Sequence, residues 1–285
     1  MLVSTVGQSP QTVGYPQARW TLATIREQCD WLRVTSLGGM WQVLKRLQLG
    51  LKRGRHYVHS PDPEYAAKLA YVQTCLHFAQ TDPDRYVAVY LDEVGYSRQP
   101  SLAADYAPVG RQHAPLARRS HHQDTVCRGL GALHPLTGQV CYVQFSTITT
   151  RRLVQFYTHL HTMFPHAETI FVIQDNWPVH NHPDVLAALL PQDYPFSPPV
   201  SASWKHLYAS PLRTGSLPIQ MVFLPTYSPW LNPIEKLWRW LKQHLLHLHP
   251  HADTFDLLKQ RVLDFIRQFE QGSPALLRYV GLLPD

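Results

Sequence analysis

The chain has 285 residues, a hydrophobic content of 45% and a net charge of +6, values that argue for a folded core and against disorder. Its four cysteines lie far apart without a CxxC pair, which disfavours a disulfide framework and a cysteine-based zinc site. No apolar run reaches transmembrane length, and the N-terminus lacks a signal-peptide pattern. We therefore expect a soluble cytoplasmic protein with no membrane contact, built from one large domain and a small accessory module.

The positive charge lies at one end of the chain. Residues 1–60 carry eight Lys or Arg and only two acidic residues, whereas the remainder holds 18 of each sign. The whole excess of +6 therefore belongs to the N-terminal segment. A basic module attached to a neutral domain indicates a polyanionic partner, with nucleic acid the first candidate.

In chain order, residues 1–18 are expected to form a disordered lead. In residues 19–60, apolar side chains recur at helical spacing on both sides of a short break, and Thr21 is placed to cap the first helix. Two short helices joined by a tight turn and followed by a basic run predict a helix-turn-helix module, with or without a wing. An ordinary helical hairpin with a solvated charged face is the alternative. The candidate DNA-contacting side chains here are Lys45, Arg46, Lys52, Arg53 and Arg55.

Residues 61–84 are expected to form a linker helix into a large domain that spans residues 85–285. In this domain we predict strands at 85–94 and 168–175, a hairpin at 124–133 and 139–147, and a further strand at 219–225. Helical periodicity covers 149–164, 182–190, 232–248 and 253–269. Residues 191–217 are rich in Pro and Ser and read as a surface insertion. The pattern predicts an α/β fold with a mixed β-sheet flanked by helices.

Three acidic residues stand out in this domain. Asp92 and Asp175 each follow a hydrophobic run that predicts a buried strand, and Glu235 lies at the start of a predicted helix. A carboxylate in such a place is costly unless its charge is compensated. If the three converge, the cluster would repel itself unless divalent cations with oxygen ligands, such as Mg²⁺ or Mn²⁺, fill it. Two metals about 3.5–4 Å apart would stabilise both the attacking and the leaving oxygen of a phosphodiester.

Each carboxylate also has a simpler explanation. Asp92 with Glu93 could be a solvated acidic turn, and Asp175 could start a turn through its side chain. Glu235 could complete a capping box in which Asn232 caps the helix.

The helix of Glu235 adds a second signal. Arg239 and Lys242 fall on the same helix face as Glu235, and the opposite face is apolar. A carboxylate with cations along one exposed stripe suits a phosphate backbone. Arg239 and Lys242 are therefore further candidates for DNA contact.

The string LPTYSPWLNPIEKLW, with an Asp-Asn and an Asp-Glu at the ends of earlier strands, closely resembles the DDE transposases of bacterial insertion sequences in the mariner-like superfamily. The resemblance runs from about Trp20 to the C-terminus. It implies a ribonuclease-H-like catalytic domain in which Asp92, Asp175 and Glu235 are the catalytic and metal-binding triad. It also implies two Mg²⁺ or Mn²⁺ ions, double-stranded DNA as the partner and a homodimer that bridges both element ends in the bacterial nucleoid. Water would cut at the element end, and the freed 3′-hydroxyl would attack target DNA.

The chain departs from this family pattern in two respects. Two helix-turn-helix units are expected before the catalytic domain, and only the second is recognised here. The 60 residues between Asp175 and Glu235 exceed the family spacing because of the insertion at 191–217.

Two other functions remain open from the sequence. One is a catalytically silent or repurposed transposase-derived DNA-binding protein, and the other is a related nuclease or resolvase that acts on branched nucleic acid. Three further side chains could belong to the site: His180, or else a loop histidine without a role, and Trp177 and Trp230, which could stack on an unpaired base or simply pack.

Overall fold

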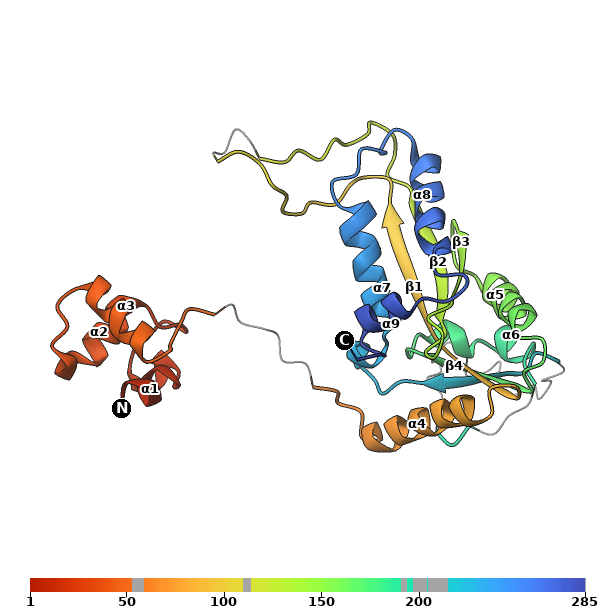
Figure 1. The fold of residues 1–285 in the computed structure, drawn as a ribbon, viewed down its shortest axis with the longest axis horizontal. Helices are drawn as coiled ribbons and strands as arrows, with labels where there is room; N and C mark the ends of the chain where they lie inside the picture. Colours follow the sequence, from red (N-terminus) through yellow and green to blue (C-terminus); the bar gives the residue numbers. More distant parts are fainter. Residues whose placement is uncertain (53–58, 110–113, 191–193, 197–203, 205–214, 285) are drawn as a thin grey trace. The chain divides into compact units, whose positions relative to one another are not determined.

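The computed structural model describes residues 1–52, 59–109, 114–190, 194–196, 204 and 215–284. Contacts divide the chain into two compact units, residues 1–57 and residues 58–285 (Figure 1). We call them the N-terminal unit and, after the catalytic domain expected from the sequence, the catalytic unit, and describe each by itself.

The N-terminal unit is a small helical module. It contains α1 (Leu2–Val6), α2 (Leu22–Gln28) and α3 (Leu37–Arg46), with 3-10 turns at Pro10–Val13 and Asp30–Leu32. As expected, Thr21 caps α2: its hydroxyl accepts a hydrogen bond from the Thr24 amide, and the Thr24 hydroxyl accepts one from the Thr21 amide. The buried side chains that hold the helices together are Leu2, Ile25, Cys29, Met40 and Leu44.

Two details of this unit differ from the prediction, and the structure also bears on the wing that the prediction left open. The expected disordered lead contains α1, and Leu2 from this helix is buried in the core. The connection between α2 and α3 is not a tight turn, because it contains the 3-10 turn Asp30–Leu32. No strand occurs in residues 1–52, so this described part of the unit has no wing. Sequence periodicity missed α1 because five residues are too few to show a helical repeat.

A five-stranded mixed sheet forms the centre of the catalytic unit (Figure 1). Its strands are β1 (Tyr86–Ser97), β2 (Val126–Leu133), β3 (Val140–Phe145), β4 (Thr169–Gln174) and β5 (Ile219–Phe223), in the order β3-β2-β1-β4-β5. β1, β4 and β5 run parallel, and the hairpin β2–β3 lies antiparallel beside β1. This is the mixed α/β sheet that the sequence predicts.

Helices cover both faces of the sheet, which is why its strands are nearly continuous in apolar residues. One face packs on α5 (Thr150–Met163) and α6 (Pro183–Leu186). The other packs on α4 (Tyr65–Thr81), α7 (Ile234–Leu241), α8 (Phe255–Arg267) and α9 (Pro274–Val280). A short π-helical turn, Lys242–Leu246, continues α7. The helix predicted at 182–190 is present only as the four residues of α6. The sequence did not predict α9.

α4 is part of the catalytic core. We expected residues 61–84 to be a linker, but Val72, Cys75 and Ala79 of α4 are buried against the sheet. The segment before α4 is held by a buried salt bridge in which Lys68 Nζ lies 2.9 Å from Asp62 Oδ2. The same Asp62 oxygen accepts a hydrogen bond from the Thr226 amide at 2.8 Å. Asp62 therefore ties the entry of α4 to the loop that precedes α7.

Two long connections leave the sheet. Residues 98–109 and 114–125, the described parts of the connection between β1 and β2, extend away from the domain body (Figure 1). The insertion predicted at 191–217 falls largely outside the described residues. Among the described residues, no helix combines the length and the hydrophobicity needed to traverse a lipid bilayer.

Candidate active site

Asp92 and Asp175 meet because they lie on neighbouring parallel strands. β1 pairs with β4 up to Tyr90 opposite Ile173. Two residues further along the same register, Asp92 falls opposite Asp175, which directly follows the end of β4. The prediction that Asp92 closes its strand is wrong, since β1 continues to Ser97 and pairs there with β2. Asp92 therefore sits where β1 leaves β4 while staying bound to β2.

The strand sends Asp92 and Glu93 to opposite faces of the sheet. Ala88, Tyr90 and Val94 belong to the core beneath α7 and α8, whereas the odd-numbered side chains Val87 and Leu91 belong to the core beneath α5. Successive side chains of a strand alternate between faces. Asp92 thus faces α7, and Glu93 faces α5.

Asp92 is deeply placed against α7. The indole Nε1–H of Trp238 donates a hydrogen bond to Asp92 Oδ2 at 3.0 Å. Burial raises the pKa of Asp92 to about 8, and the nearby charges of Glu235 and Glu93 add to the increase. Without a compensating cation, this carboxyl group would hold its proton near neutral pH.

Glu235 reaches the same place from the first turn of α7. The capping box predicted around it is not formed, because Pro233 is the N-cap residue and no side chain caps the helix. Asn232 instead donates a hydrogen bond from Nδ2 to the Leu91 carbonyl oxygen at 3.1 Å. This buried contact fixes the start of α7 on β1, one residue from Asp92. The apolar face of α7 is buried as predicted, through Ile234, Leu237, Trp238 and Leu241.

The other two carboxyl groups are perturbed in the same direction. Burial raises the pKa of Glu235, and the charges of Lys242 and Arg239 oppose this shift. Burial also raises the pKa of Asp175, although the Trp177 amide donates a hydrogen bond to Asp175 Oδ1 at 2.9 Å and lowers it. Asp175 contributes to the raised pKa of both Asp92 and Glu235. The structure thus brings the three predicted residues into one electrostatically coupled group.

The residue types of this group suit a divalent cation, although in the described part of the chain the oxygen atoms of the three do not all lie within 4.8 Å of one another, so they do not yet form a closed ligand set. Three carboxyl groups whose charges repel one another and are disfavoured by burial gain most from a bound positive charge. Their oxygen atoms are the ligands that Mg²⁺ and Mn²⁺ accept.

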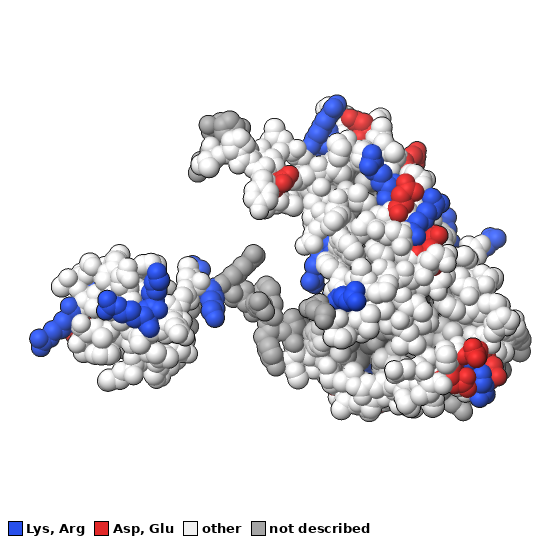
Figure 2. All heavy atoms as spheres, viewed as in Figure 1, with Lys and Arg blue, Asp and Glu red and all other residues white. Residues whose placement is uncertain are grey.

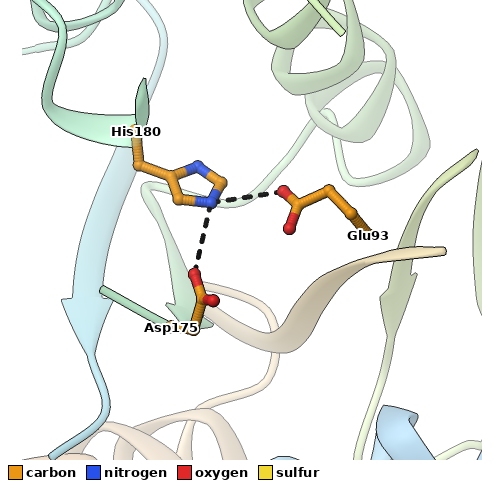
Figure 3. A group of neighbouring side chains, drawn as sticks. All are labelled: Glu93, Asp175 and His180. Atoms are coloured by element: carbon orange, nitrogen blue, oxygen red, sulfur yellow. Dashed lines mark ion pairs between the residues drawn. The ribbon is translucent and has the colours of Figure 1, made fainter. Parts of the chain in front are cut away.

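A second set of side chains lies on the α5 side of the sheet (Figure 3). The His180 Nε2 atom is 3.3 Å from Glu93 Oε1 and 3.8 Å from Asp175 Oδ1. His180 comes from the 3-10 turn Pro178–Asn181 and is completely buried. The sequence named His180 and Glu93 but gave no reason to pair them, because 87 positions separate them in the chain.

An open pocket of about 490 Å³ lies beside Glu93. Its lining also includes Arg128, Thr147, Ile148 and Trp177. It therefore combines a cation and an aromatic ring next to the acidic group. Trp230, the other tryptophan proposed to stack on a base, is about half exposed and does not line this pocket.

The predicted DNA-contacting residues fall into two groups. Lys45, Arg46 and Lys52 are exposed, and the basic side chains that surround the N-terminal unit are visible in Figure 2. Arg53 and Arg55 lie outside the described residues. Lys242 and Arg239 both lower the pKa of Glu235, which places their charges beside the carboxylates.

The sheet order and the mixed strand directions define a ribonuclease-H-like fold, in which Asp92, Asp175 and Glu235 form the candidate metal-dependent active site. Comparison with known proteins agrees with this class. Residues 87–259 match the family model of the DDE superfamily endonucleases, which is more than half of the chain. The chain therefore belongs to the DDE superfamily endonuclease family.

Individual relatives share this organisation. The chain is 22% identical over 282 residues to the insertion element IS630 uncharacterized 39 kDa protein of Shigella sonnei, covering 98% of this chain and 74% of the relative. The fold of this chain is similar to that of the Mos1 mariner paired-end complex with Mn, with a TM-score of 0.60 and 16% identity. It is similar to the Mos1 strand transfer complex with the same TM-score and identity. Each match covers 96% of this chain, and 74% and 73% of the respective Mos1 chains.

Proposed function

We propose that this protein is a transposase of an insertion sequence, which cuts DNA at the element ends and joins them to a target. The meeting of Asp92, Asp175 and Glu235 at one end of the β1–β4 pair is the observation that supports this most directly. The relative in an insertion element and the fold shared with Mos1 transposase complexes point to the same activity.

The three carboxylates would hold the divalent metal, with two ions, Mg²⁺ or Mn²⁺, as the expected complement. When bound, such ions supply Lewis-acid stabilisation of the charge on the phosphoryl oxygens. The protein's own part is to hold the carboxylates at fixed positions. Trp238 orients Asp92 by its hydrogen bond, the Trp177 amide orients Asp175, and Asn232 fixes the helix that carries Glu235.

The surrounding cations would bind the DNA backbone. Arg239 and Lys242 lie beside Glu235, where they can contact phosphates without neutralising the whole acidic group. Arg128 and Trp177 line the pocket next to Glu93, so this pocket suits a phosphate with an adjacent unpaired base.

The N-terminal unit would recognise duplex DNA through α3. Trp41, Lys45 and Arg46 are exposed on this helix, and the Lys45 ammonium lies over the Trp41 ring at 5.1 Å from its centroid. The helix therefore presents a basic surface with little acidic charge, which suits a phosphate backbone.

A homodimer is the proposed assembly. The described parts of the connection between β1 and β2, residues 98–109 and 114–125, expose large apolar side chains that no other described residue covers, namely Leu102, Tyr106, Val109 and Leu116. Clustered exposed apolar residues favour a protein partner. A second copy of the chain would fit the pairing of two element ends.

The alternative is a transposase-derived DNA-binding protein without catalysis. It would keep the N-terminal unit but would not need the carboxylates. The electrostatic cost of three coupled carboxyl groups favours a catalytic protein over this alternative, because a protein without catalysis gains nothing from keeping them.

The proposed activity can be tested by cleavage of labelled element-end DNA in Mg²⁺. We expect Asp92→Asn, Asp175→Asn and Glu235→Gln each to lower the cleavage rate by a factor on the order of 100 or more, the scale of losing one preorganised electrostatic contact. Strand transfer, followed with precleaved ends, should fall with it because both steps use the same site.

Asp184→Asn is the matched control. Asp184 is a carboxylate in α6 that is 73% exposed and, among the described residues, forms an ion pair with His182 alone, so its loss should leave cleavage unchanged. If the three site variants cut as fast as the wild type while still binding DNA, the active-site assignment is wrong. A wild-type protein that binds element ends but never cuts them would favour the DNA-binding alternative.

A further inference from the structure

Three side chains that could bind a metal lie together on the α5 side of the sheet. They are a different set from the triad of Asp92, Asp175 and Glu235. One atom each from Glu93, Asp175 and His180 can be chosen so that all three lie within 4.8 Å of one another. Figure 3 shows the imidazole directed toward both carboxylates. Asp175, which directly follows the carboxyl end of β4, is the one residue shared with the triad.

A buried tyrosine lies behind the imidazole, on the side of Nδ1. Tyr157 is fully buried in α5, and its hydroxyl donates to Gln174 Oε1 at 3.1 Å. The Tyr157 oxygen also lies 3.4 Å from His180 Nδ1, so a proton on Nδ1 has an acceptor there. In this tautomer Nε2 carries a lone pair that points at Glu93 and Asp175.

Such an arrangement is unfavourable unless a cation lies between the groups. His180 is 0% exposed, and its Nε2 atom has no hydrogen-bond partner, and neither does Glu93 Oε1. A buried lone pair facing two carboxylate oxygens is a repulsive contact in a medium of low dielectric. A metal ligand histidine, by contrast, usually donates its other N–H to an outer partner, as Nδ1 does here toward Tyr157.

We propose that Glu93, Asp175 and His180 form a second divalent-cation site, distinct from the triad but joined to it through Asp175. An imidazole nitrogen with two carboxylates suits Mn²⁺, Co²⁺ or Zn²⁺ better than Mg²⁺, which strongly prefers oxygen ligands. The proposal rests on the proposed function only in that Asp175 is shared. Tyr157 is a positioning residue in this site, because it acts through His180.

Nitrogen ligation can be measured directly in the full chain. Metal-free protein would receive half an equivalent of Mn²⁺, and pulsed electron paramagnetic resonance would detect the modulation that a bound ¹⁴N nucleus produces. We expect this modulation in the wild type and its loss in His180→Gln. It should persist in Asp92→Asn and Glu235→Gln, which damage only the triad, and in the control His182→Gln, which alters a neighbouring histidine outside the site.

Affinity provides a second readout that does not depend on a variant of the buried histidine. Glu93→Gln removes a charge at nearly constant volume, and Tyr157→Phe removes only a hydroxyl group. Tyr157→Phe should weaken Mn²⁺ binding by about 10-fold to 100-fold, the range typical of an altered outer partner, and Glu93→Gln, which alters a ligand, should weaken it at least as much. Glu168→Gln, a surface carboxylate paired with Arg85, is the matched control and should not change it. Mg²⁺ should displace the nitrogen-bound Mn²⁺ only at a large excess.

The outcomes separate this site from the proposed function. No ¹⁴N modulation in the wild type, modulation that survives in His180→Gln, or unchanged Mn²⁺ affinity in both Glu93→Gln and Tyr157→Phe would overturn the second site. The rival arrangement, a protonated His180 paired with the two carboxylates without a metal, predicts the first of these results. Modulation together with a wild type that cannot cut DNA would keep the site and reject the transposase. A wild type that cuts DNA but shows no ¹⁴N modulation would support the transposase and reject the second site.

Discussion

Asp92 shows how the surroundings of a single carboxyl group determine its chemistry. The side chain lies against Trp238 with Glu235 and Asp175 close by, and its pKa rises to about 8 chiefly because it is buried. In the unfolded chain the pKa of an aspartate is 3.8. The folded protein therefore binds this proton more tightly than the unfolded chain does.

This difference makes metal-free stability depend on pH. Between about pH 4 and pH 8 the unfolded state has released the Asp92 proton and the folded state has kept it, so raising the pH through this window destabilises the fold. The loss approaches about 1.4 kcal/mol per pH unit for one such group. We expect Asp92→Asn to remove it, so the free energy of unfolding of the variant minus that of the wild type should increase from pH 5 to pH 8.

Urea unfolding of both proteins in the presence of EDTA would measure this difference. Groups that titrate equally in the two proteins contribute equally to both free energies of unfolding and cancel. Adding Mg²⁺ at pH 8 should stabilise the wild type more than Asp92→Asn. A difference that stays constant or shrinks with rising pH would contradict the raised pKa.

At the same scale, the sequence predicted the triad but not its setting. Asp92, Asp175 and Glu235 could be named because each sits at the end or start of a recognisable element, and the resemblance to a known family combined them. The partnership of Glu93 with His180 could not be foreseen, because it depends on how a 3-10 turn after β4 folds back over the sheet. Local sequence gives no such tertiary distance.

Among the elements, the segment before α4 does more than connect. Burial alone would raise the pKa of Asp62, but hydrogen bonds from Lys68 and from the amides of Thr226 and Glu64 outweigh it and lower that pKa to about 2. The Ser60 hydroxyl also donates to the Thr226 carbonyl oxygen at 2.6 Å. These contacts hold the loop that leads into α7, and so they support the position of Glu235.

We predict that Asp62→Ala destabilises the catalytic unit by about 3–5 kcal/mol, because it leaves the buried Lys68 ammonium without its partner. Glu64→Gln is the matched control: Glu64 contacts the same ammonium at 3.6 Å but is 47% exposed, so its loss should cost less than about 1 kcal/mol. Thermal unfolding of both variants would measure this. Equal effects would show that the buried pair has no special role.

The lowered pKa of Asp62 also makes the stability of the fold depend on pH. Its stabilising effect is complete above pH 3.8 and is lost as the pH falls toward 2. Acid should therefore loosen the attachment of α4 to the loop before α7.

Element positions were largely predictable, and their ends were not. The strands, α5 and α8 appear where hydrophobic periodicity placed them, since that pattern directly reflects burial. α4 was taken for a linker because its pattern does not reveal what it packs against. The predicted N-cap of α7 was wrong because the Asn232 side chain donates its hydrogen bond to the Leu91 carbonyl oxygen of β1 and does not cap its own helix.

For the whole molecule, the charge distribution separates a basic N-terminal unit from a catalytic unit with an acidic centre. The excess of +6 in residues 1–60 was visible from composition alone. Such a surface binds DNA by releasing condensed counterions, which makes the affinity depend on salt.

We predict that Lys45→Ala combined with Arg46→Ala weakens binding to duplex DNA and reduces the slope of log affinity against log salt by about 2, one for each lost phosphate contact. Fluorescence anisotropy over a range of salt concentrations would measure both. Lys259→Ala with Arg267→Ala is the control pair, because these residues are paired with acidic neighbours on α8. An unchanged slope in the first variant would favour a helical hairpin with no role in DNA binding.

The alternation of β1 gives neighbouring residues separate duties. Because Asp92 and Glu93 project from opposite sides of one strand, their contributions can be dissected by single substitutions even though they are adjacent in the chain. Deleting one residue upstream within β1 would move the longer glutamate to the place of Asp92 beside the indole and put Val94 in the place of Glu93 beside the imidazole. The dipeptide must therefore keep its register along the strand, and not only its acidic composition.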